Sequence, residues 1–417
     1  MTQSVLDNLT LGYQPLWNPL RQLAGVQLFV GSGSASPVDA SHLLSVLQES
    51  WPEHAPPLLL SIQTHQLLCE VIECAGQHSP WVAVQEDLLG DPAMAQRVHT
   101  AHQRGLKMIW RGEPGERPTS TMASCFARNM VVLTAEEALT GLRASLARHN
   151  GSAAMTATPP KSPVVPGHIY ESVASRALVE HCLDEQGAWA VAGWPSEDVL
   201  HGYRHRIIQP DHRAVVKLIE STVADDSMES IEHTLSEEPV LVYRFMRYVN
   251  SAALGLPGGI DSLRHGLMVL GYSKLKSWLL EQLPHTTSDL SLHPIRMAMV
   301  MRARLMEHLL DAGAEDGLRR DVYLCGLLSQ IDLFMGEPLA AALQRLPLSP
   351  RIDSAILAES GPYLPYLQLA TALESPRLRH VGALCKAHQI NSEEVNRALL
   401  RTLSTVQANP AKGLLFA

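Results

Sequence analysis

The chain has 417 residues, of which 46% are hydrophobic and 18% are charged. This length exceeds what one compact core usually serves, so we expect two or three domains of ordinary globular composition. The net charge of −9 provides no overall field that would draw the chain to nucleic acid or to an anionic membrane, and we expect it to bind neither.

The six cysteines are scattered along the chain, and none forms a Cys-x-x-Cys pair. We therefore expect no zinc site, no disulfide framework and no cofactor. The N-terminus lacks a basic run followed by an apolar core, and no apolar run approaches the ~20 residues of a membrane span. These features predict a cytoplasmic protein with reduced thiols.

Short apolar runs alternate with helical patterns in residues 1–143. The runs have the length of buried strands, and they are Gln27–Val30, Leu58–Ile62, Trp81–Val84, Leu106–Trp110 and Met130–Thr134. The helical patterns between and after them are Ala40–Glu49, Thr64–Ala75, Ala93–Gln103 and Ala135–Arg148. Repeated alternation of strand and helix predicts a parallel α/β domain.

A stretch rich in proline and glycine interrupts this pattern at about residues 150–167 and predicts a flexible insertion. A helix at Tyr170–Leu183, a strand at Ala188–Ala192 and a helix start at Ser196 follow it. The α/β domain is therefore expected to resume after the insertion and to span residues 1–210.

The remaining chain, residues 211–417, shows helical patterns joined by short loops and is predicted to be one all-helical domain. Its expected helix caps are Asp211, Asp226, Ser236 and Ser262, and Gly271 is expected to end the helix that Ser262 begins. Further helices are expected at Pro294–Ala312, Asp321–Leu333, Pro338–Leu346, Ile352–Glu359 and Leu364–Glu374.

The segment Leu235–Leu279 carries an ordered series of motif elements. A helix entered at a Glu-Pro pair runs into Asn-Ser-Ala, then a glycine-rich loop, then Ile-x-Ser, then a helix closing on Leu-Gly. This order resembles the signature of HDOD domains, and here its residues are Pro239, Asn250, Ser251, Gly255, Ile260, Ser262, Leu270, Gly271 and Trp278. The resemblance implies a helical domain of bacterial signal transduction, in the circle of cyclic di-GMP control.

The same residues can be interpreted without the family. Asn250 and Ser251 end a helix and can bond to the following loop, and Ser262 restarts a helix by accepting backbone N–H groups. Glycines between them permit a tight chain path. We therefore favour a structural joint over a ligand site for this motif.

Catalytic HD phosphohydrolases, to which HDOD domains are related, carry an adjacent His-Asp pair that binds a divalent metal. The matching residues here are Ser329 and Gln330, within Tyr323–Met335. A hydroxyl and a neutral amide bind a divalent cation far less strongly than imidazole and carboxylate. The resemblance therefore implies that metal-dependent hydrolysis is lost in this half.

The chain also resembles a subgroup in which a degenerate EAL-like domain, a TIM-type barrel, precedes the HDOD domain. The likeness lies in the stretch Tyr323–Met335, in Leu346–Ser349 and in the region Ile352–Tyr366. That likeness places Gly25–Val30 where an EAL domain has its acid and phosphate-binding arginine, Gln63 near a metal-binding asparagine, and Trp110-Arg111 where two catalytic aspartates belong. The barrel is expected to be incomplete, with its open edge covered by the helical domain. Because a two-metal site needs several carboxylates, we expect neither metals nor cyclic di-GMP there.

Other patterns invite a functional reading that we do not favour. Glu137-Ala138-Leu139 spells the EAL tripeptide inside a helical pattern. His201, His205 and His212 lie close in sequence without a completing carboxylate, and Glu237-Glu238 fits a helix start, where negative charge is favourable.

Three hypotheses follow. The preferred one is a non-enzymatic regulator that binds a signalling protein. The alternatives are a residual phosphodiesterase or a binder of cyclic dinucleotides, and a nucleic-acid binder that uses Arg204–Arg206 or Arg302–Arg304.

Overall fold

The computed structural model describes residues 4–33, 38–115, 118, 120–149, 161–254, 259–310 and 316–406. Contacts divide the chain into a barrel unit, made of residues 1–198 and 372–417, and a helical unit, residues 199–371. This division differs from the expected domains 1–210 and 211–417. The barrel ends earlier than expected, and the last part of the chain returns to the barrel instead of belonging to the helical domain.

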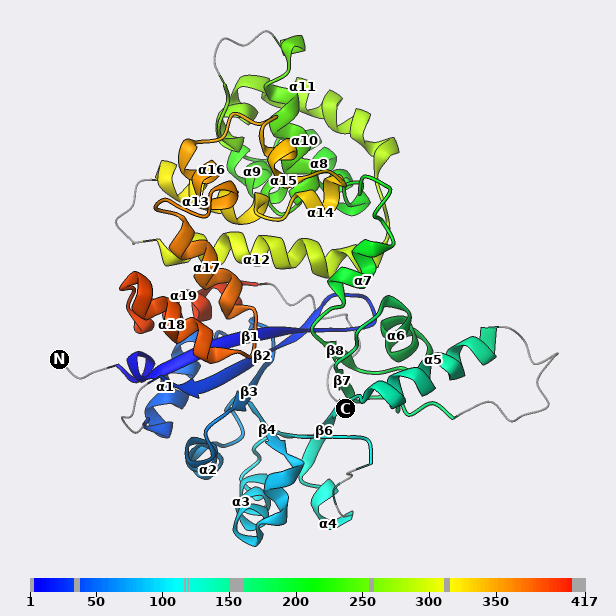
Figure 1. Ribbon diagram of the computed structural model, residues 1–417, viewed down its shortest axis with the longest axis vertical. Coiled ribbons are helices and arrows are strands. Elements are labelled where there is room, and N and C mark those ends of the chain that lie inside the picture. Colours follow the sequence, from blue (N-terminus) through cyan, green and yellow to red (C-terminus); the bar gives the residue numbers. More distant parts are fainter. Residues whose placement is uncertain are drawn as a thin grey trace. The chain divides into compact units, whose positions relative to one another are not determined.

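Eight strands form one closed barrel in chain order (Figure 1). They are β1 (Leu9–Trp17), β2 (Leu23–Ser32), β3 (Leu58–Ile62), β4 (Trp81–Gln85), β5 (Met108–Gly112), β6 (Phe126–Val132), β7 (Ile169–Glu171) and β8 (Ala190–Ala192). From β2 to β8 neighbouring strands are parallel, whereas β1 is antiparallel to both β2 and β8. The predicted TIM-type α/β domain is confirmed.

The expectation of an incomplete barrel is wrong, because two strands were not foreseen. β1 lacks a clear alternation of apolar and polar residues. β7 has three residues and lies at the start of the predicted helix Tyr170–Leu183, whose helical part begins only at Arg176. Strands this short carry no readable period.

Helices and helical turns connect the barrel strands. They are η1 (Val5–Asn8), α1 (Ala40–Ser50), α2 (His65–Cys74), η2 (Glu86–Gly90), α3 (Pro92–Gln103), α4 (Ser120–Ala123), α5 (Ala135–His149), α6 (Arg176–Glu180), the π-helical turn η3 (His181–Glu185) and α7 (Ser196–His201). The predicted helices in residues 40–148 correspond to α1, α2, α3 and α5.

The barrel interior has an apolar layer. It contains Leu16, Leu59, Trp81, Ala83, Ile109, Met130, Ile169, Ala190 and Ala192. Side chains two residues apart share one face of a strand. The next inward positions toward the carboxyl ends of β3, β5 and β7 are therefore Ser61, Arg111 and Glu171. We call this end of the barrel, formed by the carboxyl ends of β2–β8, the mouth.

The barrel closes at a seam where β1 and β8 pair through only two residue pairs, Leu16 with Ala192 and Trp17 with Val191. The amino-terminal part of β1 is instead bonded by Asn396 of α19 (Ser392–Thr405). Asn396 accepts a hydrogen bond from Leu11 N at 3.2 Å and donates to Leu6 O and Leu9 O at 2.8 and 2.9 Å. Its side chain is buried, so the open edge of β1 is bonded by a residue from the far end of the chain.

The predicted insertion at 150–167 lies partly outside the described residues, which resume at Lys161. Its second part, residues 161–167, is not a free linker. Val164 is buried, Val165 exchanges two hydrogen bonds with the Tyr170 hydroxyl, and Arg128 donates to Gly167 O. The composition of the insertion predicted flexibility because it did not reveal these partners.

The helical unit contains the predicted helices with shifted ends. They are α8 (His212–Val223), α9 (Met228–Ser236), α10 (Pro239–Val249), η4 (Ala252–Leu254), α11 (Leu263–Gln282), η5 (Leu283–His285), η6 (Leu290–Leu292), α12 (His293–Leu309), α13 (Asp316–Leu328), α14 (Asp332–Met335), α15 (Leu339–Leu343), α16 (Pro350–Leu357) and α17 (Leu364–Leu373). In the described part of the chain, no helix is both long and apolar enough to cross a bilayer.

Two of the four predicted helix caps are correct. Asp211 and Ser262 accept backbone N–H groups at the starts of α8 and α11, as expected. Ser227 and Glu238 cap α9 and α10 in place of the predicted Asp226 and Ser236. Gly271 has a φ of 68° and a ψ of 168°, so the helical stretch that Ser262 begins ends there as expected, and a second helical stretch of α11 follows the kink.

Candidate functional site

The HDOD signature residues form a joint between α10 and α11. Asn250 donates from Nδ2 to Met246 O and to Ile260 O, both at 2.8 Å, and its Oδ1 accepts from Ile260 N at 2.7 Å. One amide side chain thus ends α10 and bonds both backbone groups of Ile260, which is buried. These are the contacts of a structural joint.

Other signature residues pack around this joint. Trp278 is buried and meets Phe245 edge-on at 5.4 Å and Tyr248 in a stack at 5.7 Å between ring centroids. Pro239 and Leu270 are buried as well. The Ser251 hydroxyl is buried without a hydrogen-bond partner among the described residues, and Gly255 lies outside them.

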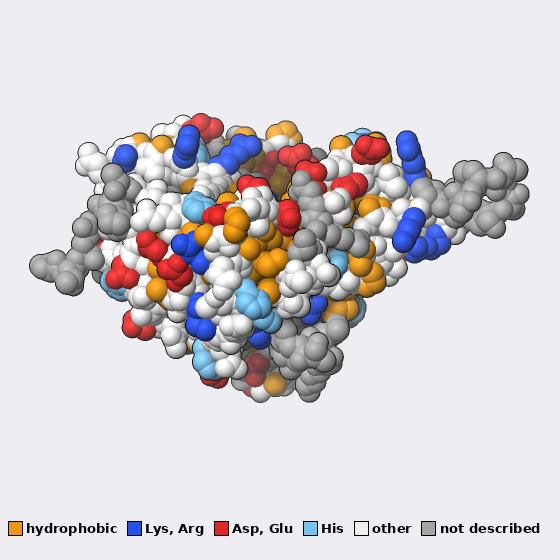
Figure 2. Space-filling model, turned by 90° about the horizontal axis from the view of Figure 1, so that it is seen from below, with side chains coloured by type: hydrophobic (Ala, Val, Ile, Leu, Met, Phe, Trp, Pro, Cys, Tyr) orange, Lys and Arg blue, Asp and Glu red, His pale blue; other side chains and the backbone are white. Residues whose placement is uncertain are grey.

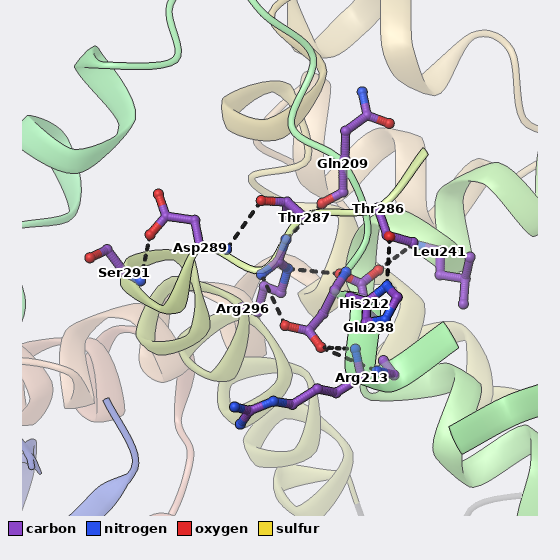
Figure 3. A network of polar contacts seen from close by, with 12 residues as sticks. Gln209, His212, Arg213, Glu238, Leu241, Thr286, Thr287, Asp289, Ser291 and Arg296 are labelled. Atoms are coloured by element: carbon purple, nitrogen blue, oxygen red, sulfur yellow. Dashed lines mark hydrogen bonds and ion pairs between the residues drawn. The ribbon is translucent and has the colours of Figure 1, made fainter. Parts of the chain in front are cut away.

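A buried charge network surrounds Glu238, the N-cap residue of α10 (Figure 3). Glu238 is 2% exposed and Arg296 is 3% exposed. They form an ion pair with 2.7 Å between Glu238 Oε1 and Arg296 Nε, although the Nε–H group is not oriented for a hydrogen bond. Arg296 also lies 3.9 Å from Asp211 Oδ2 and donates to Gln209 O at 2.7 Å. The backbone N–H groups of Asp211 and Leu241 donate to the Glu238 carboxylate.

This network joins the starts of α8, α10 and α12 through one carboxylate and one guanidinium. Burial raises the pKa of Glu238, and the charge of Arg296 and the two backbone N–H groups oppose that rise. The sequence interpretation of Glu238 as an ordinary helix-start acid missed the pairing, because Arg296 lies far along the chain.

Ser329 and Gln330 follow the end of α13, where the HD relatives have their metal-binding pair. Ser329 Oγ donates to Gly326 O at 2.8 Å and lies 3.5 Å from Nη1 of Arg302, which is 5% exposed on α12. A buried guanidinium beside the serine adds positive charge where a divalent cation would have to bind. The residues at this position therefore do not fit a metal site.

A second polar cluster lies in the mouth of the barrel. Arg111 of β5 forms an ion pair with Glu171 of β7, with 2.8 Å between Nε and Oε2. Gln27 of β2 is fully buried and donates from Nε2 to Ser61 Oγ at 2.9 Å and to Glu171 Oε1 at 3.2 Å. Among the described residues the Oε1 atom of Gln27 has no partner.

This cluster occupies the position at which the EAL resemblance expects two metal ions. Arg111 stands where that likeness places a catalytic aspartate, and its positive charge is already matched by the carboxylate of Glu171. Trp110, the other matched residue, is buried and donates from its indole to Glu86. The mouth therefore offers a paired carboxylate and a resident cation, a set that does not fit two divalent ions.

The remaining sequence candidates do not assemble into a site. Arg204 lies between two of the histidines, with its Nη1 3.0 Å from His201 Nδ1 and its Nε 3.1 Å from His205 Nε2. Glu137 lies within α5, where it bonds to Thr134. The described residues contain no group of three or more His, Cys, Asp or Glu side chains that could hold a metal ion.

The sequence analysis missed a serine–histidine–glutamate chain in the barrel unit. Ser162 Oγ lies 2.8 Å from His181 Nε2, and His181 Nδ1 lies 2.9 Å from Glu185 Oε2. The order resembles a catalytic triad, but His181 is fully buried and Ser162 Oγ accepts a hydrogen bond from Val164 N. We assign this chain a structural role, in which it fixes the end of the insertion to η3.

The Glu238 network predicts a pH-dependent stability. Replacing Arg296 with methionine leaves a buried carboxylate unpaired, which costs about 3–5 kcal/mol. The pKa of Glu238 then rises further above its value in the unfolded chain, because burial is no longer opposed by the cation. The loss of stability is expected to be complete when the pH is above the pKa of Glu238 in the folded variant. It should disappear as the pH falls below the pKa of Glu238 in the unfolded chain.

Hydrogen exchange of α10 and α12 peptides, compared at about pH 8 and about pH 5 after correction for intrinsic exchange, measures this loss. The matched control is Arg304→Met, which removes a more exposed ion pair with Glu237 and should cost at most about 1 kcal/mol. Equal effects of the two variants, or a loss that does not depend on pH, would contradict the assignment.

Comparisons with known proteins found curated relatives, solved structures and one domain family. The chain is 28% identical over 182 residues to the Bacillus subtilis protein YuxH, and this match covers 42% of each of the two chains. It is 20% identical over 198 residues to the Vibrio cholerae cyclic di-GMP phosphodiesterase CdgJ, and this match covers 47% of the chain and 46% of CdgJ. The chain thus matches about half the length of these curated relatives.

Among solved structures, the response regulator MmoQ of Methylococcus capsulatus is similar with a TM-score of 0.36 and 15% identity. The similarity covers 46% of this chain and 98% of that one. At this TM-score the likeness decides nothing further about either unit. The HDOD domain, in contrast, matches residues 209–346 directly, which confirms the predicted domain. Residues 209–346 of this chain therefore belong to the HDOD domain family.

Proposed function

We propose that the protein is a non-catalytic cytoplasmic regulator in cyclic di-GMP signalling that acts by binding a signalling protein. The proposal rests on one observation made in both units. In each unit an arginine lies at or beside the position where a catalytic relative would hold a metal. Arg111 stands where the EAL resemblance places an aspartate, and Arg302 lies 3.5 Å from Ser329 in the HDOD domain.

The physical reason is charge. A metal-dependent hydrolase holds its ions with several carboxylates and uses the ions to activate water and to offset phosphate charge. A guanidinium cannot lower the pKa of a bound water in this way, since it has no open coordination position. Arg111 also neutralises Glu171, which is the acid best placed in the mouth to bind a cation.

The signalling context comes from the relatives. CdgJ is named as a cyclic di-GMP phosphodiesterase, and the HDOD domain at residues 209–346 implies bacterial signal transduction. We extend the signalling role to this chain but not the phosphodiesterase activity, because the residues in its mouth differ in charge from a metal site.

The main alternative is that the barrel binds a cyclic dinucleotide or retains a residual phosphodiesterase activity. Nucleic-acid binding through Arg302–Arg304 is disfavoured because Arg302 is buried and Arg304 is paired with Glu237. Arg204 and Arg206 are exposed, and the net charge of −9 opposes nucleic-acid binding through them. On the face seen in Figure 2, acidic and basic side chains are interspersed rather than gathered into one basic patch.

The first test is turnover. The purified chain is incubated with cyclic di-GMP and Mg²⁺ or Mn²⁺, and linear products are measured by chromatography. We expect product formation equal to that in the protein-free buffer, since neither unit can place a metal-bound water at a phosphate. Enzyme-dependent product would contradict the proposal, and calorimetric binding without product would favour the dinucleotide-binding alternative.

A partner surface is suggested by the first half of α11. Met268 is 61% exposed and Val269 43% exposed, just before the kink at Gly271. Large apolar side chains that stay exposed on a rigid helix commonly mark protein interfaces.

The second test changes this surface. The variant Met268→Asp/Val269→Asp should reduce capture of the partner from a native lysate by at least about tenfold, as expected for an interface centre. The control is Leu280→Asp, which alters a side chain of similar exposure (48%) beyond the kink of the same helix. Equal capture by both variants and the native chain would remove α11 from the proposed interface.

A further inference from the structure

At the mouth of the barrel the inward faces of β1 and β2 each carry a glycine, next to Thr10 on β1 and Phe29 on β2. Leu16 and Gln27 point inward, so Gly12 on β1 and Gly31 on β2 share their faces. A Cβ on Gly12 would lie 2.5 Å from Ser375 O and 2.9 Å from Leu378 Cδ2, and one on Gly31 would lie 2.7 Å from Leu378 Cδ1. Another part of the chain therefore fills the space that these two side chains would need.

The occupant is the segment of residues 373–385, which we call the docking segment. It runs from the end of α17 into α18 (Leu378–His388), and residues from 372 onward belong to the barrel unit. Leu378, Val381 and Cys385 are buried along one face of α18. The helix also lies against β1 at Gly382, where a Cβ would be in ordinary contact with Thr10 Oγ1, at 3.8 Å.

A polar contact fixes the segment at the next strand. Gln63, the residue after β3, donates from Nε2 to Pro376 O at 3.0 Å. The sequence analysis matched Gln63 to a metal-binding asparagine, and in this structure its amide binds a backbone carbonyl of the docking segment instead. Asn396 then fixes the following helix, α19, along the open edge of β1.

We propose that the β1–β3 side of the barrel mouth is a peptide-binding site whose ligand is the chain's own docking segment. The Leu378 side chain packs against Gly12 and Gly31, and Gln63 donates a hydrogen bond to the backbone carbonyl of Pro376. In barrels of this type ligands bind at the carboxyl ends of the strands, so access to that face depends on release of the segment. The docking segment follows α17 directly in the chain. The inference extends the proposed regulatory function and rests on it.

Gly12→Ala tests the site most directly, because the added methyl group meets a backbone oxygen rather than a movable side chain. We expect hydrogen exchange of residues 373–388 and alkylation of Cys385 to accelerate on the order of tenfold, read by peptide mass spectrometry. Exchange in β3–β6 and in α8–α16 should stay at the native rate. The matched control is Gly76→Ala, whose added Cβ would have no neighbour within 4 Å.

A second pair of variants tests the packing of Leu378. Gly31→Ala should accelerate Cys385 alkylation, and adding Leu378→Ala should return the rate to that of Leu378→Ala alone, because the shorter side chain makes room for the new methyl group. Additive effects of the two changes would contradict the seating of Leu378 on Gly31.

Two outcomes overturn the proposal as a whole. One is a Cys385 rate in Gly12→Ala that matches the Gly76→Ala control. The other is equal exposure of Cys385 and the barrel cysteine Cys182, which would make residues 373–385 part of the barrel core rather than a docked ligand. Neither readout involves nucleotide, metal or a partner, so failure here is distinct from failure of the proposed function.

Discussion

The seam between β1 and β8 is the constraint on which the barrel unit depends. Two residue pairs leave most of β1 with unpaired backbone groups on one side, and buried groups of this kind each cost about 1–3 kcal/mol when left unbonded. Asn396 bonds two of them, Leu11 N and Leu9 O, and also donates to Leu6 O in η1. The barrel therefore needs α19, the last helix of the described residues, and this need is in keeping with the assignment of residues from 372 onward to the barrel unit.

Charge is the second constraint, and it recurs in both units. A buried or half-buried arginine lies beside each of three polar side chains. The pairs are Arg111 with Glu171, Arg296 with Glu238, and Arg302 with Ser329. A guanidinium satisfies a carboxylate or a hydroxyl permanently, whereas a metal does so while keeping a coordination position for water. The positions at which catalytic relatives bind metals are thus occupied or flanked by internal ion pairs and hydrogen bonds, in keeping with the non-catalytic role that we propose.

Much of the architecture was predictable from local pattern. The strands β3 and β4 and the helices α1–α3 and α5 follow directly from apolar periodicity, and the HDOD signature identified the joint whose Asn250 bonds Ile260 from both sides. The misses share a cause. β7 is too short for a period, and Arg296, Asn396 and Leu378 act on partners far away in sequence. The pattern of α18 and α19 shows that each has an apolar face but not which surface covers it.

Manganese titration followed by electron paramagnetic resonance tests the central claim most directly, because the free ion gives a signal that binding broadens. The full chain at neutral pH is titrated with Mn²⁺ beyond one equivalent. If Arg111 in the barrel and Arg302 beside Ser329 keep metal ions from binding, the signal grows as it does in buffer alone. Stoichiometric loss of the free-ion signal at one or two equivalents would contradict the account.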